Sequence, residues 1–171
     1  MKSFWTSFAF TLIAITSFCQ TGTEDDVVIQ LRKIIASSEE NFKTLTSGKG
    51  KKVDTNLQFE SAIKIKNTSG HSISISADEK SATYIIPVNN SLNKEQTTGL
   101  YKRWSKYVSA AINTKFQRSC SPINLGDVAK GEQCDYLIDE KTYTITITLA
   151  NIYSEDTDTN SLDLFIRKEL K

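Results

Sequence analysis

The sequence predicts an α+β domain: an antiparallel sheet of about five to six strands with two helices packed on one face, in the order α-β-β-β-α-β-β-β. Several short segments alternate apolar and polar residues, which is the pattern of strands with one buried face. Two longer segments repeat apolar residues every three or four positions, as amphipathic helices do. An antiparallel sheet with both helices on one face buries all of these apolar surfaces together.

A first helix is predicted from about residue 24 to residue 46. Thr23 is a suitable cap, and the acidic residues after it favour the positive end of the helix dipole. One face then carries residues at helical spacing: Val28, Leu31, Ile35, Ser38, Phe42 and Leu45. Gly48 and Gly50 mark its end.

Residues 47–52, with the sequence SGKGKK, combine glycine and lysine, as phosphate-binding loops do. Such a loop needs G-x-x-x-x-G-K-[ST] between a strand and a helix. Here the spacing differs, no Ser or Thr follows the lysines, and the segment follows a helix. A solvated basic turn is therefore expected.

Three strands that form an antiparallel meander are predicted next, at about 57–65, 72–76 and 82–88. In the first, one face is shared by Leu57, Phe59, Ser61, Ile63 and Ile65. Pro87 has no N–H donor, so it is expected at a strand end or on an edge of the sheet.

A second helix is predicted from about residue 93 to residue 117, with Asn93 as its cap. Its apolar stripe consists of Leu100, Trp104, Val108, Ala111 and Ile112. We expect Trp104 to lie against the sheet, near Phe59, Ile145 or Ile147.

The rest of the chain is predicted to form a loop and then two or three strands. Residues 119–134 contain a proline, two glycines and few regularly spaced apolar residues, as loops do. Strands are expected at 135–138, 142–153 and 161–170. The second of these alternates threonine with Tyr143, Ile145, Ile147 and Leu149, and threonine favours strands.

This order of elements resembles the fold of type III secretion chaperones and related small α/β sandwich proteins. The resemblance covers most of the chain and concerns the order of elements rather than a motif. Those chaperones are cytoplasmic and acidic, whereas this chain is neither. The resemblance therefore implies a shape and carries no activity or site residue to this chain.

Residues 1–19 are expected to be a signal peptide, which leaves residues 20–171 as a single domain. Lys2 is followed by an apolar run that is strongest at 8–15, shorter than the roughly 20 residues that span a membrane. Small residues at Ser17 and Cys19 predict cleavage before Gln20. A glutamine after the cut resembles exported proteins of Bacteroidota-type bacteria. The expected location is secreted or periplasmic.

If Cys19 is not removed with the signal peptide, two other roles are open to this part of the chain. Cys19 can be the lipid-bearing cysteine of a bacterial lipoprotein, although Phe18 stands where Gly, Ala or Ser usually precedes such a cysteine. The apolar run can also stay as an anchor or as a core N-terminal helix.

A disulfide is predicted between Cys120 and Cys134. Once Cys19 is removed, these are the two remaining cysteines of the chain, in an oxidising compartment. They bracket the predicted loop, so the bond would tie the end of the second helix to the sheet.

The composition and motifs assign no catalytic residue, no cofactor and no metal ligand. The chain has 21 basic and 20 acidic residues, so no net field attracts nucleic acid or an anionic membrane. His71, the single histidine, is expected in an exposed turn, and one histidine limits both zinc sites and catalytic triads.

Residues 156–161 resemble the beginning of an EF-hand calcium loop. Asp156, Asp158 and Asn160 match positions 1, 3 and 5, but Ser161 replaces the glycine at position 6 and Arg167 replaces the glutamate at position 12. A polar hairpin turn is therefore expected.

These observations predict a non-enzymatic binding domain for an unknown protein or small-molecule partner. The alternatives are a hydrolase that uses carboxylate or hydroxyl chemistry and an inhibitor or immunity-type partner of another exported protein. A deep pocket with converging acidic or tyrosine side chains would favour the hydrolase. A flat or grooved apolar surface would favour a partner protein.

Overall fold

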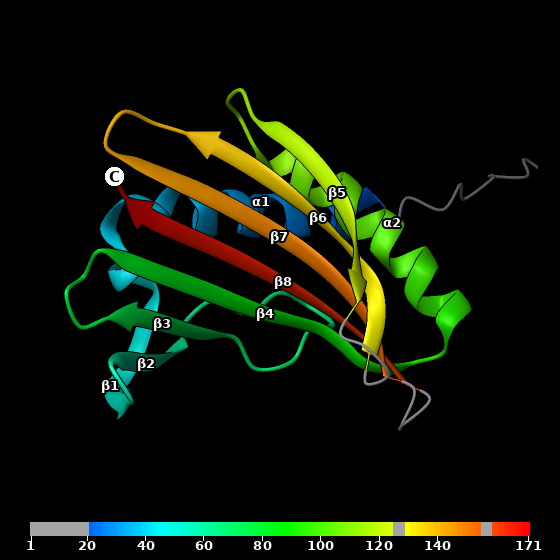
Figure 1. Cartoon of the computed structure of the whole chain (residues 1–171), viewed down its shortest axis with the longest axis horizontal. Helices are drawn as coiled ribbons and strands as arrows, with labels where there is room; N and C mark the ends of the chain where they lie inside the picture. The colour runs from blue at the N-terminus through cyan, green and yellow to red at the C-terminus, as the bar shows by residue number, and fades with distance from the viewer. Residues whose placement is uncertain (1–20, 125–128, 155–158) are drawn as a thin grey trace, which may run out of the picture.

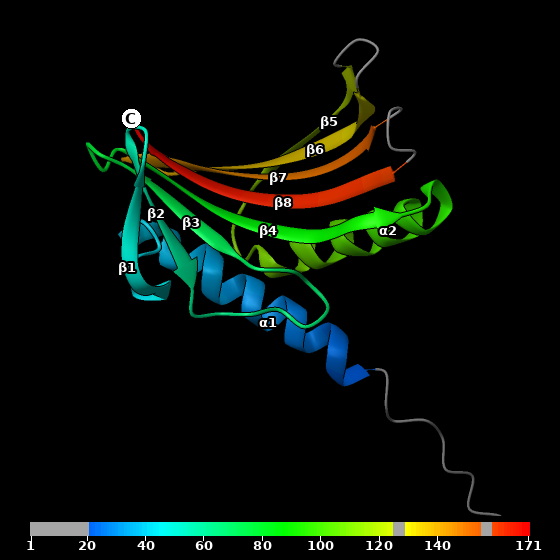
Figure 2. The ribbon, with the colours of Figure 1, turned by 90° about the horizontal axis from the view of Figure 1, so that it is seen from below.

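The computed structural model describes residues 21–124, 129–154 and 159–171, in which the strands form one antiparallel sheet and two α-helices lie beneath one face of it (Figures 1 and 2). The predicted signal peptide, residues 1–19, lies outside the described residues, as do Asp156 and Asp158. Within the described ranges, no helix is long and apolar enough to cross a membrane.

The elements follow in chain order as α1 (Thr21–Ser37), β1 (Thr46–Val53), β2 (Asn56–Ser61), β3 (Ser72–Ser76), β4 (Ser81–Leu92), α2 (Lys94–Ala111), β5 (Gln117–Asn124), β6 (Ala129–Asp139), β7 (Tyr143–Ser154) and β8 (Thr159–Leu170). The strand order across the sheet is β1-β2-β3-β4-β8-β7-β6-β5. The sheet therefore consists of two meanders, β1–β4 and β5–β8, which are joined where the last strand, β8, pairs with β4.

The predicted number of strands, about five to six, is wrong, because the described residues form a sheet of eight. Two of the additional strands are the edges of the sheet. β1 contains the basic segment that was expected to be a turn, and β5 with the start of β6 contains the expected loop. Most β1 side chains and nearly all β5 side chains are exposed, so their sequences show no apolar alternation. Backbone pairing defines these strands instead.

Both edge strands carry features that discourage pairing with another chain. β1 contains Lys49, Lys51 and Lys52, and its register with β2 is irregular between Ser47 and Lys51. β5 contains Pro122, which has no N–H donor. Lysines, bulges and prolines are the usual protections of a sheet edge, so these edges disfavour the addition of a further strand.

α1 ends at Ser37, well before the predicted end near residue 46. Asn41 and Phe42 have left-handed backbones, with φ of 54° and 57°, through which an α-helix cannot continue. Two short 3₁₀ turns, Ser38–Glu40 and Lys43–Leu45, complete the segment. The reversal still buries Phe42, whose ring packs edge-to-face on Tyr84 with centroids 5.6 Å apart.

Lys168 of β8 holds this turn against the sheet. Its side chain is 5% exposed, and Nζ donates to Oδ1 of Asn41 at 2.8 Å and to the carbonyl oxygen of Glu39 at 3.3 Å. Burial lowers the pKa of the ammonium group, and the nearby Glu39 carboxylate partly opposes this change. The cation lies at the carbonyl end of the α1 segment, where positive charge is favourable.

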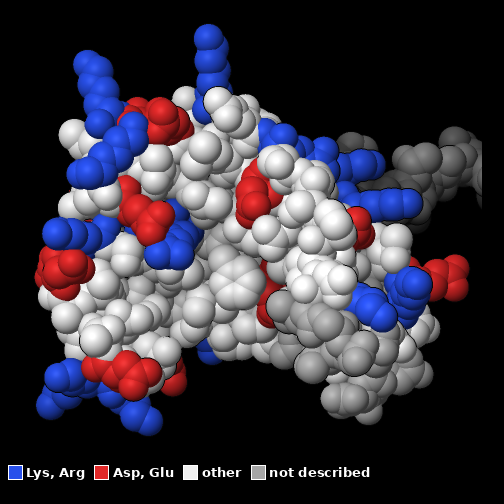
Figure 3. Space-filling view, viewed as in Figure 1, with Lys and Arg blue, Asp and Glu red and all other residues white. Residues whose placement is uncertain are grey.

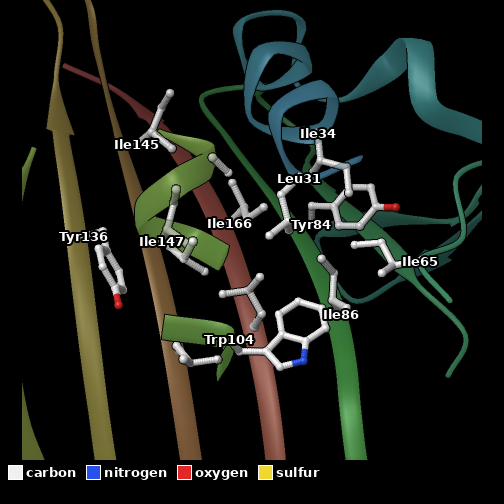
Figure 4. Close-up of a cluster of buried hydrophobic side chains, with 14 of the residues drawn as sticks. Leu31, Ile34, Ile65, Tyr84, Ile86, Trp104, Tyr136, Ile145, Ile147 and Ile166 are labelled. Carbon is white, nitrogen blue, oxygen red and sulfur yellow. The ribbon is translucent and has the colours of Figure 1, made fainter. Parts of the chain in front are cut away.

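The core lies between the helices and the sheet (Figure 4). Its fully buried aliphatic members are Leu31, Ile34, Ile73, Ile86, Ile147, Leu149, Leu162, Leu164 and Ile166. Trp104 of α2 is 4% exposed, so its predicted burial against the sheet is confirmed. The predicted neighbours are only partly right, because the indole points toward Ile86 of β4 and away from Ile145 of β7 (Figure 4).

Pro87 lies in β4 just beyond the β3–β4 ladder, which ends at Ile85. Its carbonyl oxygen accepts from the backbone N–H of Ser69 at 3.1 Å. In a strand, the N and O of one residue point to the same side, so the missing donor faces away from β8. Pro87 therefore removes no hydrogen bond from the β4–β8 ladder, although it lies inside β4, between β3 and β8 in the sheet order, and not at a strand end or on an outer edge as predicted.

Candidate functional site

One face of the sheet carries no helix in the described part of the chain, and we call it the open face. Strand register places its side chains in rows that cross β4, β8, β7, β6 and β5. The central row is Ile85, Phe165, Thr148, Asp135 and Ser119. The rows beside it are Pro87, Asp163, Ala150, Gln133 and Ser121, and Thr83, Arg167, Thr146, Leu137 and Gln117.

The open face is concave, because the strands bow away from the helices toward both of their ends (Figure 2). Ile85, Phe165, Thr148 and Asp135 are half-buried although no helix covers them, and Ala150 is only 4% exposed. The centre of this face has few charged side chains, whereas lysine and arginine gather toward its rim (Figure 3). A shallow, mostly uncharged hollow results.

Two carboxylates border this hollow. Burial raises the pKa of half-buried Asp163, and a hydrogen bond from Ser161 only partly opposes that change. The carboxylate oxygens of Asp135 accept from Oγ1 of Thr148 at 2.6 Å and from Nε2 of Gln133 at 3.2 Å. Neither carboxylate has an ion-pair partner among the described residues.

The only basic side chain in the three rows is already neutralised. Arg167 pairs with Glu169 at 2.6 Å, with both side chains about half exposed. The hollow therefore combines negative charge with the apolar surface of Phe165 and Ile85. Such a surface suits a ligand with an apolar body and positively charged groups.

His71 does not lie in an exposed turn, as predicted, but is buried beside Tyr84 on the helix side of the sheet, with 6% of its surface exposed. The hydroxyl of Thr68 donates to the carbonyl oxygen of Ile65 at 2.7 Å, so its oxygen is free to accept from Nε2–H of His71 at 2.6 Å. Nδ1 of His71 then accepts from the hydroxyl of Tyr84 at 3.0 Å.

This hydrogen-bond chain continues into the β2–β3 segment. Tyr84 accepts from the hydroxyl of Ser61 at 2.5 Å, and the oxygen of Ser61 accepts from the backbone N–H of Ile63 at 3.0 Å. The hydroxyl of Tyr84 also lies 3.4 Å from the carbonyl oxygen of Ile63. Both ring nitrogens are occupied by partners within the protein, so His71 is a structural residue.

Cys120 and Cys134 face one another across β5 and β6, with their Cα atoms 4.1 Å apart and their sulfur atoms at disulfide distance. The predicted pairing thus agrees with the structure, but the bond joins two paired strands of the sheet and does not tie the end of α2 to the sheet. The hydroxyl of Tyr101 donates to Sγ of Cys134 at 3.1 Å. Burial, followed by the charge of Glu132, raises the pKa of Tyr101 to about 12.

No group of three His, Cys, Asp or Glu side chains could hold a metal ion within the described ranges. Asn160, from the calcium-like pattern, lies on the core side of β8 with 3% exposure, and its Nδ2 has no hydrogen-bond partner. Oδ1 of Asn151 on the neighbouring strand is also buried without a partner. Both amides are at the end of the sheet near the start of α2.

The residues of the open face were not identified from the sequence. In the predicted 161–170 strand, Asp163 and Arg167 occupy ordinary polar positions between Leu162, Leu164 and Ile166, so nothing in the sequence distinguishes them. An aromatic residue at such a position, Phe165, was the one available signal, because large apolar residues on solvent faces often mark binding surfaces.

Comparisons with protein-family models, with curated proteins and with solved structures gave no match to this chain. The site is therefore interpreted from its own geometry and chemistry.

We expect the Cys120–Cys134 bond to stabilise the domain measurably. Cross-linking a loop of about 15 residues contributes roughly 3 kcal/mol in the chain-entropy model. A reductant should therefore lower the urea midpoint of the wild-type protein, and a Cys120→Ala/Cys134→Ala variant, already destabilised, should not respond to it. Thiol titration of the denatured protein should reveal two additional thiols after reduction. Equal thiol counts before and after reduction would show that the bond is absent.

Stability should fall as the pH decreases below 6.5, the ordinary pKa of histidine. Burial lowers the pKa of folded His71, a backbone hydrogen bond with Ile63 partly opposes this change, and the charge of Lys64 adds a smaller lowering. The unfolded chain therefore takes up a proton before the folded one does. The loss is at most about 1.4 kcal/mol per pH unit, and the slope from this group fades above pH 6.5 and is negligible by about pH 8. Urea unfolding between pH 5 and pH 8 measures it.

A His71→Gln variant is the matched control, because the chain has no other histidine. We expect it to be less stable by about 1–3 kcal/mol at pH 8, since buried partners lose their hydrogen bonds. Its slope between pH 5 and pH 6.5 should largely disappear. A variant that keeps the full wild-type slope would exclude His71 as the cause.

Proposed function

We propose that this chain is an exported, non-enzymatic binding domain that holds a basic segment of a partner protein on the open face. The main support is the half-buried carboxylate of Asp163 beside Phe165, in a concave surface where none of the described basic side chains forms an ion pair with it. A cationic group from a partner would relieve this unfavourable burial of negative charge. The neighbouring apolar surface would pack against the body of the same segment.

The dimensions of the open face favour a protein segment over an enclosed small molecule. The central row crosses five strands, and neighbouring strands are about 4.8 Å apart, so the row extends roughly 19 Å. An α-helix with its side chains is about 10–12 Å wide and fits within this width. The shallow hollow leaves one side of such a segment exposed to solvent.

The hydrolase alternative has less support from the same geometry. Both oxygens of Asp135 accept hydrogen bonds from neighbouring side chains, and His71 and the two paired cysteines serve structural roles. An inhibitor or immunity-type partner of another exported protein is a specific form of the proposed function, since it also binds through a surface.

Export is part of the proposal and rests on residues 1–19, with cleavage before Gln20 and a secreted or periplasmic mature domain. A Cys120–Cys134 bond is consistent with an oxidising compartment. Lipidation of Cys19 remains the alternative, and it would leave the open face available on a membrane-attached domain.

The purified protein should bind a short amphipathic peptide of Lys, Leu and Ala more tightly than a matched peptide with Glu in place of Lys. Fluorescence anisotropy gives the affinities, and amide chemical shifts locate the binding surface. Asp163→Asn removes one charge with little change in shape and should weaken binding of the lysine peptide by about fivefold or more. Phe165→Ala should weaken it to a similar extent by removing apolar contact area.

Glu40→Gln is the matched control, because Glu40 is an exposed acid on the helix side. It should leave the affinity within about twofold, the range expected of a distant surface charge. Equal binding of the two peptides, or equal effects of Asp163→Asn and Glu40→Gln, would contradict the proposal.

A further inference from the structure

A cavity of about 620 Å³ lies between α1, α2 and the segment that joins β2 to β3, on the side of the sheet opposite the open face. Pockets of about 300–1,000 Å³ are typical for small molecules. This cavity uses none of the residues of the open face, so it is independent of the function proposed above.

The inner wall of the cavity is apolar. Trp104 from α2, Ile65 from the β2–β3 segment and Val88 from β4 contribute to it, and each is at most 4% exposed. Figure 4 shows how Trp104 and Ile65 approach from different elements on either side of Ile86. Val27, Leu100 and Tyr107 also line the cavity, and these half-buried side chains add apolar surface that a ligand can contact.

The mouth of the cavity is positively charged. Lys64, Lys66 and Arg103 line it from two different elements, and all three are exposed. Among the described residues none of them forms an ion pair. Among the residues whose side chains are described, Asp26 of α1 is the single acidic one in the lining, so three described cations face one described carboxylate.

We propose that this cavity binds a small organic anion, with its apolar body against Trp104, Ile65 and Val88 and its acidic group between Lys64, Lys66 and Arg103. The acidic group is a carboxylate or a phosphate ester, since ammonium and guanidinium groups bind both. The cations are exposed and the apolar residues of the inner wall are buried, which orients the ligand with its charge toward solvent.

The anionic dye 8-anilinonaphthalene-1-sulfonate and its uncharged analogue N-phenyl-1-naphthylamine test this proposal, because they share one ring system. In a Trp5→Phe background Trp104 is the sole tryptophan, so quenching of its emission reports dye that is close to the cavity. We expect the triple variant to bind the sulfonate dye at least about tenfold more weakly and the uncharged dye less than about twofold more weakly. This variant is Lys64→Gln/Lys66→Gln/Arg103→Gln.

The control variant Lys49→Gln/Lys51→Gln/Lys52→Gln removes the same charge from the distant edge strand β1 and should change neither affinity by more than about twofold. Asp163→Asn, on the open face, should also leave the affinity for both dyes unchanged. The cavity and the open face are thus tested independently, and a negative result for one proposal does not count against the other. Equal loss of sulfonate binding in both triple variants would overturn the proposal.

Competition experiments, in which a second acid displaces the bound sulfonate dye, then identify which acidic group the cavity prefers. Decanoate represents a fatty carboxylate and 1-naphthyl phosphate represents an aromatic phosphate ester. We expect at least one of them to restore Trp104 emission in the wild-type protein but not in the cavity variant at the same concentration. Displacement by neither compound would also overturn the proposal.

Discussion

The pairing of β4 with β8 is the contact on which the rest of this structure depends. It runs from Ser81 opposite Glu169 to Leu92 opposite Asn160, and it joins a strand before α2 to the last strand of the chain. Without it the two meanders, β1–β4 and β5–β8, would each expose an unpaired edge, β4 or β8, in the middle of the molecule. Such a distant pairing costs loop-closure entropy, so it has to be stabilised by the surfaces that it completes.

β8 completes both faces of the sheet at once. Leu164 and Ile166 are fully buried toward the helices, whereas Asp163 and Phe165 alternate with them on the open face. Lys168 extends the core side of the strand by bonding to the turn after α1. A shift of one residue would exchange the two sets and place Asp163 in the core. The packing of the core therefore fixes the geometry of the open face.

Sequence patterns predicted those parts of the fold whose residues carry their own local signal. The threonine alternation of β7 and the capped stripe of α2 are of this kind, and so is the pairing of the two later cysteines. The edge strands carry no such signal, and Gly131, counted as evidence for a loop, lies in β6 where a side chain would collide with the backbone of Asn151. The open face was not predictable for a different reason. Asp135 and Asp163 come together only through the register of β6, β7 and β8.

Native-state hydrogen exchange tests most directly whether β8 unites the two meanders. Amides of Tyr84 in β4 and of Ile147 in β7 belong to different meanders, and both residues are fully buried. If the β4–β8 pairing makes the sheet one cooperative unit, both amides exchange with the same opening free energy, equal to that of global unfolding. Protection of the β7 amide that persists after the β4 amide has opened, with a clearly different dependence on denaturant, would contradict this account.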